Sequence, residues 1–194
     1  MVIQESKKFI HWNYFLAIES DVTVLSRFVE FTKDNFKTYS LETAHLLLAA
    51  ASEVDVVAKL LCKEVDPHSS PERINEYREI LDPALPIIKD MGVTIPRFGL
   101  SLTPWLNWRS NQTPHWWSDY NAVKHERNLN FKKANLKNTV NSIAGLFVLL
   151  LHYYKTAAEK AELVPDPSLF KVADKFIAGV ETLGAQVRIR YQFI

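Results

Sequence analysis

Three observations predict an all-α protein, a compact bundle of about five helices, for this sequence. Long segments rich in Leu, Ala, Lys and Glu favour helices, and 5 Gly in 194 residues are too few for the many turns of a β-sandwich or barrel. The hydrophobic share of 47% is enough for a sizeable core. Apolar residues recur at helical spacing in several segments. The length suits a single helical domain over residues 1–194.

The first three helices are expected over residues 12–35, 41–64 and 71–82. Ser40 is a suitable N-cap for the second helix, and Glu42 lies in its first turn, where a carboxylate is favourable. Ser70 followed by Pro71 is the pattern of a cap and a first-turn proline, which predicts the start of the third helix.

Two further helices are expected in the second half of the chain. The fourth begins with Thr113 as N-cap and Pro114 next, and it ends near residues 128–130. The fifth covers residues 134–163. Its apolar stripe consists of Leu136, Val140, Ile143, Phe147, Leu151 and Tyr154. We expect this stripe to form the core against four residues of the second helix, Leu46, Ala50, Val57 and Leu61.

Strands are expected only as minor elements. Prolines and glycines prevent any long regular element over residues 83–105, where we expect a short strand at residues 93–95. Residues 165–194 are predicted as an appendage with a short helix over 168–183. Residues 187–193 alternate apolar and polar side chains, the period of a half-buried strand. Either that strand is a dimer contact or it packs as a tail.

Several classes of protein find no support in the sequence. The most apolar run, residues 142–154, is shorter than the ~18 residues that would suggest a membrane span, and the N-terminus lacks the order of a signal peptide. Cys62 cannot form an internal disulfide, which fits a cytoplasmic protein, and its apolar neighbours favour a buried thiol over a nucleophile. The six His are not spaced as metal ligands, and phosphate-binding glycine loops and serine-hydrolase motifs do not occur. We expect no metal, no cofactor and no membrane partner.

The charge of the chain is uneven although its formal net value is +1. Residues 105–137 carry six Lys or Arg against two Asp or Glu, together with four of the five Trp. Basic groups among aromatic rings fit single-stranded nucleic acid, because cations contact phosphates and rings stack on unpaired bases. The same composition also fits a solvated charged face over a Trp-rich core.

The segment TPHWWSDYNAVKHERN, residues 113–128, is the first candidate site. At about 100° of rotation per residue, Trp116, Tyr120 and Val123 share an inward stripe. A second, polar stripe consists of Trp117, Asn121, Lys124, His125 and Asn128. Either these residues bind a ligand, or they are ordinary polar side chains exposed to solvent.

Glu53 places a carboxylate in an apolar stripe of the second helix. An unpaired buried carboxylate costs several kcal/mol, so a cation or a donor must face it. We expect that partner on the fourth helix, from Lys124, His125 or Arg127. Glu53 is then either a structural ion pair or the supporting carboxylate of a site.

The segments YSLETAHLLLAAASEVDVVAKLLCKEV and WWSDYNAVKHERNLNFKKANLKNTVNSIAGLFVLL resemble bacterial proteins of the HEPN superfamily. The resemblance covers residues 39–154. It implies a compact helical bundle, commonly a two-fold dimer. Members of the superfamily include metal-independent endoribonucleases, toxins and antiphage effectors, and others are inactive binding modules.

The resemblance also implies candidate catalytic residues, because the catalytic members carry an Arg a few residues before a His. Arg109 and His115 have that order in RSNQTPH, with five residues between them. His125 and Arg127 are the other candidates, in the reverse order. Metal-free RNA cleavage needs a base, an acid and a cation on the phosphate, which imidazole and guanidinium groups can supply.

Two functions therefore stay open. The chain is either an RNA- or nucleotide-binding protein, with metal-independent endoribonuclease activity of the toxin or phage-defence type as its catalytic form, or a non-catalytic adaptor or antitoxin-like module that holds a protein partner. A homodimer is expected in both cases.

Overall fold

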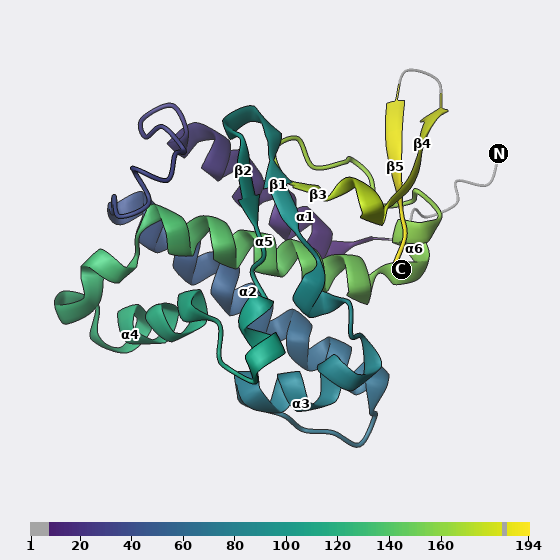
Figure 1. Ribbon diagram of the computed structural model, residues 1–194, viewed down its shortest axis with the longest axis horizontal. Helices are drawn as coiled ribbons and strands as arrows, with labels where there is room; N and C mark the ends of the chain where they lie inside the picture. Colours follow the sequence, from purple (N-terminus) through teal and green to yellow (C-terminus); the bar gives the residue numbers. More distant parts are fainter. Residues whose placement is uncertain (1–7, 184–185) are drawn as a thin grey trace.

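The computed structural model describes residues 8–183 and 186–194 and combines helices with two small antiparallel sheets (Figure 1). The helices among these residues are α1 (Ile10–Leu25), α2 (Leu41–Val65), α3 (Ile74–Ala84), α4 (His115–Asn130), α5 (Leu136–Tyr153) and α6 (Lys155–Glu159). The strands are β1 (Val93–Ile95), β2 (Leu100–Leu102), β3 (Lys171–Val172), β4 (Ile177–Leu183) and β5 (Gln186–Tyr191). The all-α prediction is therefore wrong, and the fold is mixed α/β.

Helix α5 forms the centre of the core because it is covered on every side. All residues from 142 to 152 are buried, and α1, α2 and α4 contact the helix. A helix that is apolar all round must be covered all round. The predicted stripe is confirmed, with Leu136, Val140, Ile143, Phe147 and Leu151 buried and Tyr154 half-buried. Its predicted partners on α2, Leu46, Ala50, Val57 and Leu61, are buried as well.

The N-termini of α2 and α5 are joined by side-chain hydrogen bonds. Ser40 is the N-cap of α2, as predicted, and its Oγ accepts from the Thr43 N–H at 3.1 Å. The Thr43 hydroxyl donates to the Ala134 carbonyl at 2.7 Å, and the Thr139 hydroxyl donates to the Thr43 carbonyl at 3.0 Å. These bonds fix the start of α5 against the first turn of α2.

Gly145 allows tryptophan rings to approach α5. A Cβ at this position would lie 3.0 Å from Cζ2 of Trp116. The indole of Trp105 donates to the Gly145 carbonyl at 3.1 Å, and the indole of Trp116 donates to the Pro104 carbonyl at 2.8 Å. Buried indole N–H groups need such partners. The segment before α4 is therefore part of the core.

Several predicted helix ends are wrong. Helix α1 ends at Leu25 rather than near residue 35, and α3 begins at Ile74 rather than at residue 71. Thr113 does not cap α4, because its hydroxyl donates to the side-chain oxygen of Asn75 at 3.1 Å. Tyr154 separates α5 from α6.

The two small sheets are the reason why the all-α prediction is wrong. The predicted strand at residues 93–95 is confirmed as β1, and it pairs with both β2 and β3. Residues 168–183, predicted as a helix, instead form β3, a short turn and β4. The strand predicted near the C-terminus is confirmed as β5, which pairs with β4 of the same chain. Strand pairing, with β1 for β3 and with the adjacent β5 for β4, outweighs helical propensity here.

A buried carboxylate, Glu19 of α1, attaches the C-terminal segment to the bundle. Its side chain accepts hydrogen bonds from the backbone N–H groups of Ser168, Leu169 and Phe170 at 2.8–2.9 Å. The Ser168 hydroxyl donates to it as well, at 3.2 Å. Glu19 is 3% exposed. The sequence did not single out this residue, because its donors are backbone groups about 150 residues away.

No helix in the described part of the chain is both long and apolar enough to cross a membrane.

We predict that Phe147→Ala lowers the free energy of unfolding by about 3–5 kcal/mol, because it leaves a large cavity. The Phe147 ring is fully buried and stacks on Phe15, with centroids 5.1 Å apart. Urea denaturation measures the change. Phe28→Ala is the matched control, because Phe28 is 78% exposed. A loss below about 1 kcal/mol at Phe147 would contradict this core arrangement.

We predict that Glu19→Ala and Glu19→Gln each lower the free energy of unfolding by about 3 kcal/mol or more. Both changes remove acceptors from buried N–H groups, and each unsatisfied buried donor costs ~1–3 kcal/mol. Asp21→Ala is the control on the same helix, because Asp21 is exposed. Equal stability of the Glu19 and Asp21 variants in urea would show that these hydrogen bonds do not hold the segment.

Candidate functional site

Helix α4 carries most of the predicted site residues. Trp116, Tyr120 and Val123 are buried, as predicted. Trp117, predicted on the polar stripe, is also covered, with 6% exposure. The four tryptophans of this region, Trp105, Trp108, Trp116 and Trp117, are therefore core residues that cannot stack on a base. Any stacking at this end of the molecule needs other aromatic rings.

A kink at Glu126 changes the direction of the last turn of α4. The backbone there has φ −140° and ψ 56°, which is not helical. Arg127 follows Lys124 by three positions and Val123 by four, a spacing that places residues on one face of a helix. It lines the same groove as Lys124 and His125.

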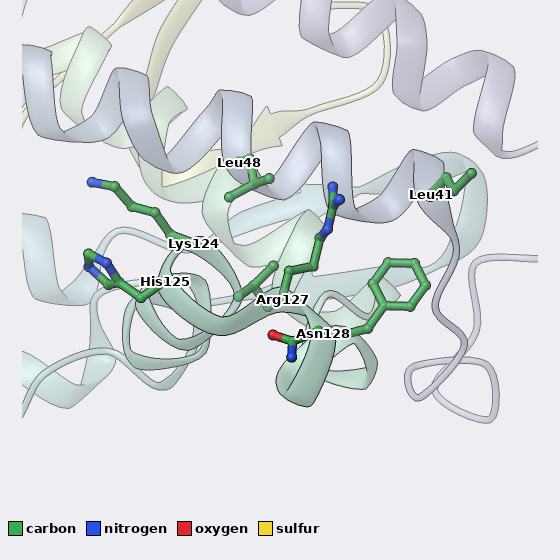
Figure 2. Close-up of a pocket in the computed structure, with 8 residues that line it drawn as sticks. Leu41, Leu48, Lys124, His125, Arg127 and Asn128 are labelled. Carbon is green, nitrogen blue, oxygen red and sulfur yellow. The ribbon is translucent and has the colours of Figure 1, made fainter.

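This groove lies between α4 and α2 and has a volume of about 730 Å³. We call it the cationic groove, and it is lined by Leu41, Leu48, Val123, Lys124, His125, Arg127, Asn128 and Phe131. Figure 2 shows Lys124 and Arg127 extending from α4 toward α2 on either side of Leu48. The lining contains no carboxylate. It therefore offers positive charge over an apolar floor.

The cations of the groove are not neutralised within the described residues. Neither Lys124 nor Arg127 has an ion-pair partner among residues 8–183 and 186–194. The Lys124 ammonium lies 5.6 Å from the centroid of the Tyr120 ring. Both side chains are exposed. Their charges are available to an anionic ligand.

Aromatic rings border the groove at its α5 end. Phe131 lines it and meets Tyr39 edge-on, with centroids 5.4 Å apart and planes at 78°. Tyr39 is 50% exposed and Leu41 is 66% exposed. This surface suits a ligand with a planar or apolar part beside its negative charge.

Arg109 and His115, the other predicted catalytic pair, do not lie in one site. Arg109 lies in the short turn over residues 106–110, and its guanidinium donates to the Asp90 carboxylate at 2.5 Å. His115 begins α4 and is exposed. It lines a second pocket, of about 660 Å³, which Arg109 does not line. We call this second site the lysine pocket; its lining is Lys33, Asp34, Phe36, Lys37, His115, Asp119, Asn135, Lys137 and Asn138.

Two predicted ligand-binding residues face away from the cationic groove. Trp117 and Asn121 line a pocket of about 540 Å³ between α4 and α3. Its charges are mixed, since it includes the ion pair of Lys59 with Asp55 at 2.6 Å. Lys124 lines both this pocket and the cationic groove. The predicted polar stripe is thus divided between two sites.

Glu53 pairs with α1 and not with α4. Its carboxylate lies 2.5 Å from Nδ1 of His11, and both side chains are mostly buried. The His11 backbone N–H also donates to the Tyr154 hydroxyl at 3.4 Å. The predicted partner on the fourth helix is therefore wrong, because Glu53 projects toward α1. The sequence held no signal that would select His11.

Two further reactive side chains are core groups. Burial raises the pKa of the Cys62 thiol to about 12, so it is no nucleophile at neutral pH. His152 hydrogen-bonds the Val148 carbonyl through Nδ1 at 2.8 Å. Burial lowers the pKa of His152 to about 4. The burial of Cys62 is as the sequence predicts.

Within residues 8–183 and 186–194, no group of three or more His, Cys, Asp or Glu side chains is placed to hold a metal ion. No protein-family model matches the chain, and neither a curated protein nor a solved structure does. The chemistry of the groove itself is therefore the basis for a functional interpretation.

We predict that the stabilising contribution of neutral His152 is lost as the pH falls from 6.5 toward 4. The depressed pKa means that the unfolded chain binds a proton in this range and the native protein does not. The loss amounts to roughly 3 kcal/mol at ~1.4 kcal/mol per pKa unit. Urea denaturation of the wild type and of His152→Leu over this pH range measures it. A stability difference between the two proteins that stays constant with pH would contradict the prediction.

Proposed function

We propose that this protein binds RNA or another nucleotide-containing ligand in the cationic groove. The observation that carries the proposal is the lining of the groove, in which Lys124, His125 and Arg127 occur without any carboxylate. Lys and Arg both bind phosphate groups, and the planar guanidinium of Arg can do so through two hydrogen bonds. The resemblance to HEPN proteins remains a prediction that agrees with this ligand class.

The groove can contact each part of a nucleotide. The planar guanidinium of Arg127 can bind two phosphate oxygens, and Lys124 adds a point charge. The Asn128 amide provides a donor and an acceptor for a base edge or a ribose hydroxyl. Phe131 and Leu48 form apolar walls for a base or a sugar. Anionic and apolar contacts then come from the same few residues.

Metal-independent RNA cleavage is the catalytic form of this proposal, and it is favoured by His125 and Arg127 lining one groove. His125 would accept the 2′-OH proton, the 2′ oxygen would attack phosphorus, and Arg127 would hold the phosphate oxygens. The departing 5′ oxygen needs a proton from a second acid. We propose that a homodimer supplies that acid from the partner's copy of the groove, and that the protein acts in the cytoplasm.

We predict that Lys124→Ala and Arg127→Ala each weaken binding of a fluorescent single-stranded oligoribonucleotide about tenfold or more, because each removes a charged hydrogen bond. Each variant should also reduce the slope of log affinity against log salt by roughly 0.7 to 1. Anisotropy titrations over a salt series measure both quantities. Lys63→Ala is the control, because Lys63 is exposed on α2 outside the groove.

The same mixtures of protein and oligoribonucleotide show whether the protein cleaves RNA. Chelator-resistant cleavage that His125→Ala abolishes, in a protein with unchanged melting temperature, supports the catalytic form. Binding without cleavage leaves a non-catalytic module. If Lys124→Ala and Arg127→Ala bind RNA and nucleotides like the wild type, the proposal fails. The exposed apolar residues Leu41 and Leu129 then favour the alternative of a protein partner.

A further inference from the structure

The lysine pocket is a second site of excess positive charge. Lys33, Lys37 and Lys137 line it, and none of them has an ion-pair partner in the part of the chain that the structure describes. Two carboxylates line it as well. That of Asp119 already accepts from the Asn138 amide at 2.8 Å and lies 3.7 Å from the Lys133 ammonium.

Asp34 is the remaining carboxylate of the pocket, against three lysines. The pocket therefore has a surplus of cations. All three lysine side chains are exposed to solvent.

A single shared wall separates the lysine pocket from the cationic groove. The wall consists of residues 36–41 and 131–138, which contribute lining residues to both sites. Two backbone hydrogen bonds join its halves, from the Leu136 N–H to the Thr38 carbonyl at 2.8 Å and from the Lys137 N–H to the Phe36 carbonyl at 3.1 Å. In Figure 1 these segments lie at the end of the molecule opposite the β4–β5 hairpin.

The two sites are close enough for one short ligand to occupy both. Lys37 lines the lysine pocket and Leu41 lines the cationic groove. Four residues of extended chain span at most about 14 Å, which bounds the distance between their Cα atoms. Tyr39 lies midway between them in sequence. It forms a bridge with Asn135 and is 50% exposed.

We infer that the ligand is an extended single-stranded polynucleotide whose backbone runs from the cationic groove over Tyr39 into the lysine pocket. This inference rests on the proposed function and specifies its substrate class. Phosphates would contact Lys124 and Arg127 at one end and Lys37 and Lys137 at the other. A base between them would stack on the exposed face of Tyr39.

Other phosphate ligands match this surface less well. A mononucleotide carries its phosphate at one end and can engage only one of the two cation clusters. A duplex keeps its bases stacked inside, so no base is free to stack on Tyr39. A single strand presents both phosphates and unpaired bases along its length. Its contacts are independent of sequence, as is usual for stacking and phosphate binding.

The test compares an oligouridylate that is long enough to cross both sites, the same strand in a duplex with its complement, and uridine monophosphate. We expect the double variant Lys37→Ala/Lys137→Ala to bind the single strand at least tenfold more weakly. Its salt slope should fall by roughly 1.4, about 0.7 for each phosphate contact. Tyr39→Ala should weaken binding of the single strand about 5- to 100-fold through lost stacking. Binding of uridine monophosphate should not change in either variant.

The controls are a second double variant, Lys63→Ala/Lys160→Ala, and Tyr14→Ala. These side chains are exposed and line neither site. Melting temperatures check that every variant is folded.

Two results would overturn the inference. One is a duplex that binds as tightly as the single strand. Another is wild-type affinity for the single strand in both the lysine double variant and Tyr39→Ala. If those variants bind like the wild type but Lys124→Ala and Arg127→Ala bind more weakly, the proposed function stands and the ligand occupies the cationic groove alone. If Lys124→Ala and Arg127→Ala also bind like the wild type, the proposed function fails together with the inference.

Discussion

The hydrogen-bonded junction between the start of α2 and the start of α5 is the constraint on which the candidate sites depend. Thr43 and Thr139 join the two helices, and backbone bonds from Leu136 and Lys137 extend the junction into the preceding turns. Leu136 and Lys137 also belong to the wall between the cationic groove and the lysine pocket. Because buried backbone groups must be paired, the wall cannot shift without breaking several of these bonds. Its exposed face can therefore present Tyr39 and its neighbours in a fixed arrangement.

A core helix that is apolar on every side also explains why the fold is not a simple bundle. Helices α1, α2 and α4 contact α5, and the C-terminal segment adds Phe170, Phe176 and Tyr191 to the same core. Glu19 holds the start of that segment through three backbone N–H groups. A carboxylate buried among apolar side chains is favourable only when its oxygens are hydrogen-bonded. Both oxygens of Glu19 meet that condition.

Several cations of the protein are matched by a carboxylate, whereas those of the cationic groove are not. Arg109, Lys59 and Lys89 each have a carboxylate within 2.7 Å, so their charges are matched inside the protein. Lys124 and Arg127 have no such partner among the described residues, although they share a concave surface with apolar walls. Unmatched like charges in one groove repel each other unless an anion joins them. These charges are open to the anionic ligand that we propose.

The sequence alone determined the features that depend on neighbours within a few residues. The limits of α2, its Ser40 cap, the buried stripe of α5, and the strands β1 and β5 all follow from local periodicity and capping. Tertiary contacts, and not local patterns, make residues 168–183 mainly extended and pair Glu53 with His11. The tertiary structure also showed that the tryptophans are core residues, which leaves Tyr39 and Phe131 as the rings beside the cations. The physical reason is that the pairing of β3 with β1, the choice of an ion-pair partner and the covering of a side chain are set by residues far away in the sequence, which a local pattern cannot specify.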